Sequence, residues 1–207
     1  QSPCTPSANT YGRCCGSASP IGLGDVIFGN SINNNIAYNA SKNYYDLTST
    51  QSACVNAGSG YSLQVYADGN SYQHAICVWI DWNSDGTFAS SEIVLSDSMV
   101  SAGGSASTTV NVPSGQSSGN YRMRVMGDYY YYYAYQNASW NPCQAFYGEF
   151  QDYNIRVAST SGIDVFAVSV SSPSTNSVPA PISELGQEQA LNASDPATDQ
   201  SLHIPES

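Results

Sequence analysis

The chain has 207 residues, of which 16 are acidic and five are basic, giving a formal net charge of −11. So few positive groups cannot follow a phosphate backbone, so the composition excludes nucleic acid as a partner. The same charge disfavours binding to anionic membrane surfaces. The longest apolar run, residues 75–80, is too short to cross a bilayer, which excludes membrane insertion, and this chain length suits one core with an appendage.

Short strand-like runs recur along the chain between clusters of turn residues. The runs are rich in β-branched and aromatic residues, and several alternate apolar with polar side chains, as strands with one wet face do. They lie at residues 25–28, 61–66, 75–82, 93–95, 108–112, 121–126 and 150–157. This spacing predicts an all-β domain over residues 1–158, an antiparallel β-sandwich of the jelly-roll or immunoglobulin-like kind.

The segment from Asp81 to Glu92 has the spacing of a twelve-residue calcium loop, with oxygen-bearing side chains at positions 1, 3, 5 and 12 and glycine at position 6. The ligands would be the side chains of Asp81, Asn83, Asp85 and Glu92 and the backbone carbonyl of Thr87. Strand-like runs flank the segment, so the loop would end a hairpin. The alternative is an Asp-Gly turn that hydrogen-bonds its own backbone and binds nothing. Because the match to the calcium-loop spacing extends to the distant Glu92, the sequence favours a Ca2+ site over the turn.

A run of five tyrosines follows Asp128, and a tryptophan lies nearby. Tyrosine combines an apolar ring with a polar tip, which suits both wet protein interfaces and stacking against sugars. As a loop between two strands, the run would place several rings on the surface, where they would bind a protein or a glycan. As a tyrosine-rich strand, it would pack half of its rings in the core. The aromatic residues concerned are Tyr129, Tyr130, Tyr131, Tyr132, Tyr133 and Trp140.

The composition changes after about residue 159. Residues 163–170 alternate in the manner of one more strand, and from Ser172 the chain is rich in Pro, Ser and Asn, with acidic but no basic residues. Such a segment cannot form a core of its own. We expect residues 159–207 to form an extended C-terminal arm that lies on its own domain or completes the sheet of a neighbouring subunit.

Six cysteines without metal-ligand spacing predict disulfides rather than a zinc site. They are Cys4, Cys14, Cys15, Cys54, Cys77 and Cys143. The adjacent Cys14 and Cys15 would have different partners, because a ring between neighbours is strained. A chain that begins with Gln1 and carries disulfides is expected to be the mature form of a secreted or cell-surface protein.

The segment from Phe146 to Tyr153 resembles the signature of the GEVED domain, a module of secreted bacterial proteins. Further motifs of that family precede it in order: Cys4, Gly24-Asp25-Val26, Tyr45-Asp46-Leu47-Thr48, residues 78–88 with Glu92, residues 121–125 and Pro142-Cys143. The resemblance covers about residues 4–158. It implies a β-sandwich, a secreted or surface location and a disulfide between an early cysteine, Cys4, and Cys143, but no catalytic activity. Phe150 and Gln151 depart from the signature, replacing its Val and its second Glu.

The alternation around the signature predicts a structural polar cluster. Glu149 has the parity of the core-facing residues, so it needs hydrogen-bond donors, a cation, or a bulge at Gly148 that turns it outward. Asp152 has the opposite parity and would meet Arg122 and Arg124 on the outer face of the sheet. We expect a structural rather than a catalytic role for these carboxylates, since no Ser-His-Asp or Cys-His set is visible in the sequence.

The sequence favours a non-enzymatic extracellular structural protein, a surface or filament subunit that associates with copies of itself through the arm and is stabilised by Ca2+ and disulfides. The alternative is a carbohydrate-binding or adhesive module that uses the tyrosine run and Trp140. A hydrolase is the weakest hypothesis, and His74 and His203 are interpreted as incidental.

Overall fold

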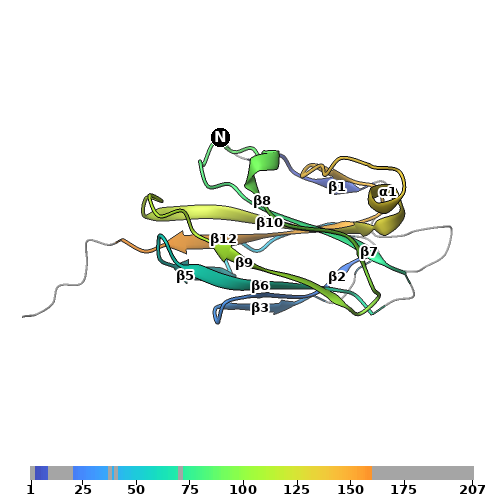
Figure 1. Ribbon diagram of the computed structural model, residues 1–207, viewed down its shortest axis with the longest axis horizontal. Helices are drawn as coiled ribbons and strands as arrows, with labels where there is room; N and C mark the ends of the chain where they lie inside the picture. The colour runs from blue at the N-terminus through green and yellow to red at the C-terminus, as the bar shows by residue number, and fades with distance from the viewer. Residues whose placement is uncertain (1–2, 9–20, 37–38, 40–41, 70–71, 160–207) are drawn as a thin grey trace, which may run out of the picture. The chain divides into compact units, whose positions relative to one another are not determined.

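The computed structural model describes residues 3–8, 21–36, 39, 42–69 and 72–159, all of which lie within one compact unit spanning Gln1–Val165. The predicted strand at 163–170, the arm from residue 160 onward, Cys14, Cys15 and His203 lie outside the described residues. Within them the chain is nearly all β, with one short α-helix (Figure 1).

Three sheets make up the described fold. The largest has the strand order β4 (Tyr44–Asp46), β12 (Glu149–Val157), β10 (Gly119–Tyr129), β7 (His74–Ile80) and β8 (Ile93–Val100), and β5 (Ser52–Val55) also pairs with β12. The second has the order β3 (Ile32–Asn35), β2 (Leu23–Phe28), β6 (Gly60–Ala67) and β9 (Ser105–Asn111). A short third sheet pairs β1 (Ser7–Ala8) with β11 (Gln144–Ala145).

All seven strands predicted within the described residues are present, and the all-β prediction is confirmed. The pairing is not purely antiparallel, because β4 and β5 both run parallel to β12, and β1 runs parallel to β11. These parallel strands have two to four residues each, too short to show an alternating pattern in the sequence.

The six-stranded sheet is covered on both faces. One face packs against the four-stranded sheet through apolar side chains such as Val26, Leu63, Val78 and Val125. On the other face lie β1 and the helix α1 (Tyr130–Ala134), with a second apolar cluster beneath them (Figure 1). This explains β7, in which all seven residues are buried, because a strand covered on both sides reads as a continuous apolar run.

Among the described residues, a disulfide joins Cys4 to Cys143, which are 139 apart in the sequence, as the family resemblance implied. The expectation that every cysteine pairs is wrong for Cys54 and Cys77, which carry free thiols. Cys54 is exposed at the sheet edge, whereas Cys77 is buried, and its burial raises the pKa of the thiol. No helix in the part of the chain that the structure describes could cross a membrane.

Candidate functional site

The predicted calcium loop connects β7 to β8, two antiparallel neighbours, so it does end a hairpin as expected. Both carboxylate oxygens of Asp81 accept hydrogen bonds inside the loop, from the amides of Asp85 at 3.2 Å and Gly86 at 3.1 Å. Gly86 has a φ of +79°, which favours glycine at this tight turn. Asp81 is therefore the organising residue of the turn.

The other predicted ligands also accept bonds from nearby amides. Asn83 accepts one from the amide of Asp85, and Asp85 accepts two, from the amide and the hydroxyl of Thr87. Glu92 accepts one from the amide of Ala89 at 3.0 Å. Among the described residues, no three His, Cys, Asp or Glu side chains gather closely enough to hold a metal. The donors are all oxygens, the kind that Ca2+ prefers, and oxygens that accept one bond keep a further lone pair. Calcium binding stays a prediction.

Arg122, Arg124 and Asp152 meet, as the strand parity predicted. Arg124 donates to both Asp152 oxygens at 2.7 Å, and Arg122 donates to the same carboxylate at 2.9 Å. Their expected position on an exposed outer face is wrong, because Arg124 and Asp152 are fully buried. The third layer covers both side chains on this face of the sheet. It includes Phe88, whose ring centroid lies 4.8 Å from the guanidinium carbon of Arg124.

Glu149 points into the core and is met by hydrogen-bond donors. Gln151 donates to its carboxylate at 2.6 Å, the hydroxyl of Tyr153 donates to Gln151, and Asn34 on β3 donates to that hydroxyl at 2.9 Å. A bulge at Gly148 that turns Glu149 outward is therefore not needed, and from Glu149 to Val157 β12 pairs with β10 in unbroken register. The result is a buried polar chain from β12 to the opposite sheet. Burial raises the pKa of Glu149 to about 7.

We expect the stability of the fold to fall as the pH rises towards 7, owing to Glu149. Between its ordinary pKa of 4.5 and about 7, the unfolded carboxyl ionises while the buried one stays neutral, so unfolding releases a proton. The loss should approach about 3 kcal/mol above pH 7. Urea unfolding across this range should show it in the wild type but not in Glu149→Gln, which keeps an acceptor for Gln151 and cannot ionise. A constant difference between the two proteins at every pH would contradict this account.

His74 is not the incidental residue expected from the sequence. It is fully buried at the start of β7, where Nε2 lies 3.0 Å from a carboxylate oxygen of Asp68 and Nδ1 lies 3.1 Å from the carbonyl of Tyr72. Asp68 also accepts a bond from the amide of Gly22 at 3.2 Å. This pair ties the loop after β6 to β7 and has a structural role.

The tyrosine run forms neither the predicted loop nor the alternative strand. Tyr129 ends β10, and the next residues form the single turn of α1. They belong to a continuous cluster of stacked and edge-on rings, which we call the aromatic cap. Its members are Tyr72, Tyr129, Tyr130, Tyr131, Tyr132, Tyr133, Tyr135, Trp140, Phe146 and Tyr147.

Two parallel ring pairs form the interior of the aromatic cap. Tyr132 stacks on Phe146 with centroids 3.8 Å apart, and Tyr133 stacks on Trp140 at 4.3 Å. Tyr133 is buried, in keeping with the alternative that some rings pack inside. Since these ring faces already have partners, the run is not a flat, open platform of tyrosines.

Asp128 anchors the aromatic cap. Its buried carboxylate accepts bonds from the hydroxyl of Tyr133 and from the amides of Tyr129, Phe146 and Tyr147, each at 2.8 Å. Burial raises the pKa of this carboxyl, and these four bonds oppose the shift by favouring the ionised form. The sequence alone does not predict this role of Asp128. The one feature that could have indicated it is the position of an acidic residue directly before five tyrosines.

Two further contacts attach the aromatic cap to the sheet. Arg124 donates to the carbonyl of Pro142 at 2.8 Å, next to the Cys4–Cys143 disulfide. Gly148 lies so close to β10 that an added Cβ would stand 2.1 Å from the carbonyl oxygen of Gly127. Glycine is therefore required where the segment from the aromatic cap returns to the sheet.

The model of the GEVED domain family matches residues 75–156, from β7 to β12. Among solved structures, the chain is similar to a family 123 glycoside hydrolase from Clostridium perfringens, described in connection with glycolipid glycan hydrolysis. The identity is 12% and the TM-score 0.31 over 56% of this chain and 23% of that one, a likeness too distant to support any inference. No curated protein matches the chain. We therefore assign residues 75–156 to the GEVED domain family, as the sequence motifs predicted.

Proposed function

We propose that this protein is a non-enzymatic extracellular structural subunit that associates with copies of itself through the exposed surface of the aromatic cap. The observation that carries the proposal is the position of the exposed large hydrophobic side chains. Among the described residues these are Met99, Tyr131 and Tyr135, with 45%, 43% and 60% of their surface exposed. Scattered exposed residues would mean little, but neighbouring ones mark an interaction surface.

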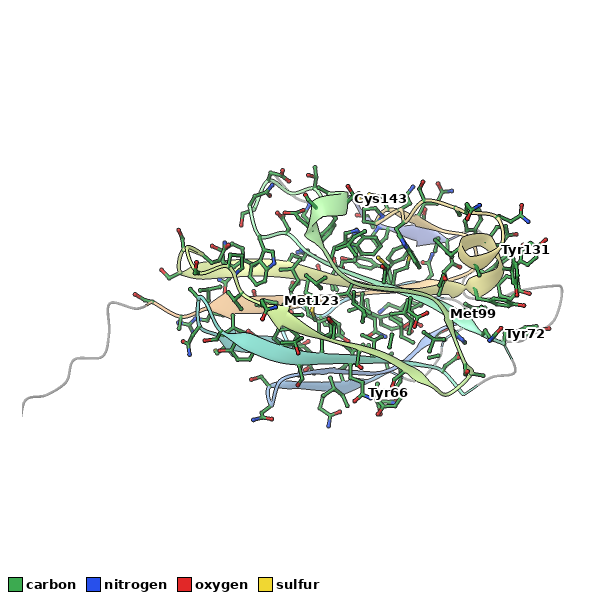
Figure 2. The ribbon with its side chains drawn as sticks, viewed as in Figure 1. Tyr66, Tyr72, Met99, Met123, Tyr131 and Cys143 are labelled. Atoms are coloured by element: carbon green, nitrogen blue, oxygen red, sulfur yellow. A yellow bond between two sulfur atoms is a disulfide. The ribbon has the colours of Figure 1, made fainter. Side chains whose placement is uncertain are left out.

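By the strand register, Met99 lies at the same end of the six-stranded sheet as the aromatic cap. Tyr129 pairs with His74, and His74 pairs with Val100, so the cap and the end of β8 lie at the same end of the sheet. Val100 belongs to the core between the sheets, so its neighbour Met99 points to the face that carries α1. Figure 2 shows Met99 and Tyr131 towards this end.

Charge favours the same surface for contact between two copies. A net charge of −11 makes identical molecules repel each other over most approaches. Residues 129–148, which supply most of the aromatic cap, contain no charged side chain at all. Two copies that meet cap to cap bring together aromatic groups, which are favoured in protein interfaces, without setting carboxylates from this segment against each other.

The two facing sheets would form a sandwich of the jelly-roll or immunoglobulin-like kind. A disulfide suits an oxidising, extracellular compartment. The arm, residues 159–207, would add a second contact between subunits if it completes a neighbour's sheet. A carbohydrate-binding module is the second candidate, favoured by a neutral cavity beside the aromatic cap.

Self-association should weaken when the exposed rings are removed. We expect Tyr131→Ser with Tyr135→Ser to lower the association constant at least tenfold, since buried tyrosines at interfaces commonly contribute about 1–2 kcal/mol or more each. Sedimentation velocity over a range of concentrations measures this. Tyr66→Ser, on β6 of the other sheet (Figure 2), is the matched control and should leave association unchanged. If the wild type, the double tyrosine variant and Tyr66→Ser associate equally, the aromatic cap is excluded as the contact between copies.

Calcium would stiffen the subunit through the loop at residues 81–92. Extracellular calcium modules bind with Kd values of about 0.1–1 mM, so a tenfold excess of Ca2+ over Kd should stabilise the fold by about 1.4 kcal/mol. Asp81→Ala and Glu92→Ala should abolish this gain. Thermal unfolding is measured in Ca2+ and in chelator. The loss of turn hydrogen bonds lowers the stability of the variants in both conditions, whereas the loss of calcium binding lowers it only in Ca2+. Asp97→Ala on β8 is the control for loss of an acid outside the loop. If the melting temperature of the wild type is the same in Ca2+ and in chelator, the calcium site is excluded.

A further inference from the structure

A cavity of about 320 Å³ opens beside the aromatic cap, between α1 and the segment that leads to β11. Its apolar walls include Tyr133, Ala145 and Phe146, and its polar lining comes from Ser139, Asn141 and Gln144. None of its lining residues carries a charge. The size lies at the lower end of the range for small-molecule sites.

The two aromatic walls are set at an angle to each other. The rings of Tyr133 and Phe146 are inclined at 74°, with centroids 6.1 Å apart. Each ring is also fixed by a stacked partner, Trp140 for Tyr133 and Tyr132 for Phe146. Both rings therefore border the cavity at an angle to each other, and one face of each is already covered by its stacked partner.

The polar groups are neutral and can both donate and accept hydrogen bonds. A serine hydroxyl and an amide group each match alcohol groups, which also donate and accept. The side-chain oxygen of Asn141 already accepts a bond from the amide of Cys143 at 2.9 Å, so its NH₂ group is left as a donor. An anionic ligand would find no cation among these residues, and a cationic ligand no carboxylate.

The cavity is held in shape before any ligand arrives. Asp128 fixes Tyr133 through its hydroxyl and Phe146 through its amide, both at 2.8 Å. The disulfide at Cys143 and the pairing of β1 with β11 fix the opposite wall. A preformed site avoids the entropic cost of ordering loops when it binds.

We propose that this cavity binds one or two rings of a neutral sugar, with an apolar sugar face against the aromatic walls and hydroxyl groups bonded to Ser139, Asn141 and Gln144. The combination of aromatic surface, neutral amides and a hydroxyl fits the mixed surface of a pyranose. The inference develops the second candidate function and does not depend on self-association. It also moves the binding site away from the open tyrosine surface expected from the sequence.

The test is a titration of the full chain with neutral sugars, in which ligand-observed NMR detects binding. The sugars are the methyl glycosides of glucose and galactose, and N-acetylglucosamine. Glucuronic acid serves as the charged counterpart. We expect binding of at least one neutral sugar and weaker or no binding of glucuronic acid. Asn141→Ala and Gln144→Ala should each weaken binding about five- to tenfold, as expected for the loss of a ligand hydrogen bond.

The matched control is Gln136→Ala, which removes an exposed amide that bonds Tyr131 and does not line the cavity. It should bind the sugar like the wild type. Ser139→Tyr, which fills the cavity, should abolish binding while circular dichroism shows the native fold. The proposal is overturned if no neutral sugar binds, or if binding survives Asn141→Ala, Gln144→Ala and Ser139→Tyr. Sedimentation of Asn141→Ala, Gln144→Ala and Ser139→Tyr should match the wild type, so the sugar site and self-association can fail separately.

Discussion

Arg124→Ala should destabilise the protein by about 3–5 kcal/mol, the usual cost of removing one partner from a buried ion pair. Arg124 is fully buried and makes two bonds of 2.7 Å with Asp152, which is equally buried. Without the guanidinium, Asp152 keeps Arg122 and the hydroxyl of Tyr44 as partners but loses its closest counter-charge. The carbonyl of Pro142 loses a donor at the same time.

Chemical denaturation of Arg124→Ala beside Arg156→Ala measures this effect. Arg156 lies on the neighbouring strand β12 and is exposed, so its loss should change stability by no more than about 0.5 kcal/mol. Arg124→Lys, which keeps the charge but not the two-pronged contact, should fall between the wild type and Arg124→Ala. A cost for Arg124→Ala as small as that for Arg156→Ala would show that the buried pair is not needed for stability.

Removal of the Cys4–Cys143 disulfide should be about as costly. The bond closes a loop between residues 139 apart in the sequence, and a loop of that length corresponds to about 5 kcal/mol of chain entropy in the unfolded state. Measured losses for native disulfides reach this value at the upper end of their range, about 2–5 kcal/mol. We therefore expect Cys4→Ser with Cys143→Ser to unfold at much lower denaturant concentration than the wild type.

Cys54→Ser is the control for this experiment, because Cys54 is an exposed free thiol and its replacement should leave the denaturation midpoint unchanged. The double variant should also loosen the aromatic cap, since Cys143 adjoins the segment that Arg124 holds. Near-ultraviolet circular dichroism of the tyrosines would report that loosening. Equal midpoints for the double variant and the wild type would contradict the entropic account of this bond.

The strands that could be predicted are those in which β-branched and aromatic residues alternate with polar ones or follow one another without a break. β7 and β10 are examples, because burial on one or both faces leaves a clear pattern in the sequence. β3 was missed because its sequence, Ile32 followed by three asparagines, has little intrinsic preference for a strand. Its pairing with β2 outweighs that preference. Only tertiary structure determines such an element.

The same limit applies to the candidate site. Strand parity correctly brought Arg122 and Arg124 to Asp152, because alternation fixes which face a side chain takes. It could not show that a third layer covers this face, since the parts of that layer leave no periodic pattern in the sequence. They are the two-residue strands β1 and β11, the single turn of α1 and the loops between them. Asp128 was missed for a related reason, because its partners Phe146 and Tyr147 lie far along the chain.

The signature residues now have separate physical roles. Gly148 allows close approach to β10, Glu149 begins the buried polar chain, and Asp152 pairs with Arg124. Gln151, which replaces a glutamate of the family signature, donates directly to Glu149. A glutamate at that place would set two carboxyl groups against each other, and one of them would have to stay protonated. The motif is thus explained by packing and by polar contacts in the core.

We expect the aromatic cap itself, rather than residues 160–207, to join one copy to another. Sedimentation velocity of a chain that ends at Ser159, compared with the full chain over the same concentrations, tests it most directly. If the aromatic cap is the contact, the shortened chain should still associate as concentration rises, and Tyr131→Ser with Tyr135→Ser should return it to monomer. A shortened chain that stays monomeric while the full chain associates would place the contact in residues 160–207 and contradict the claim.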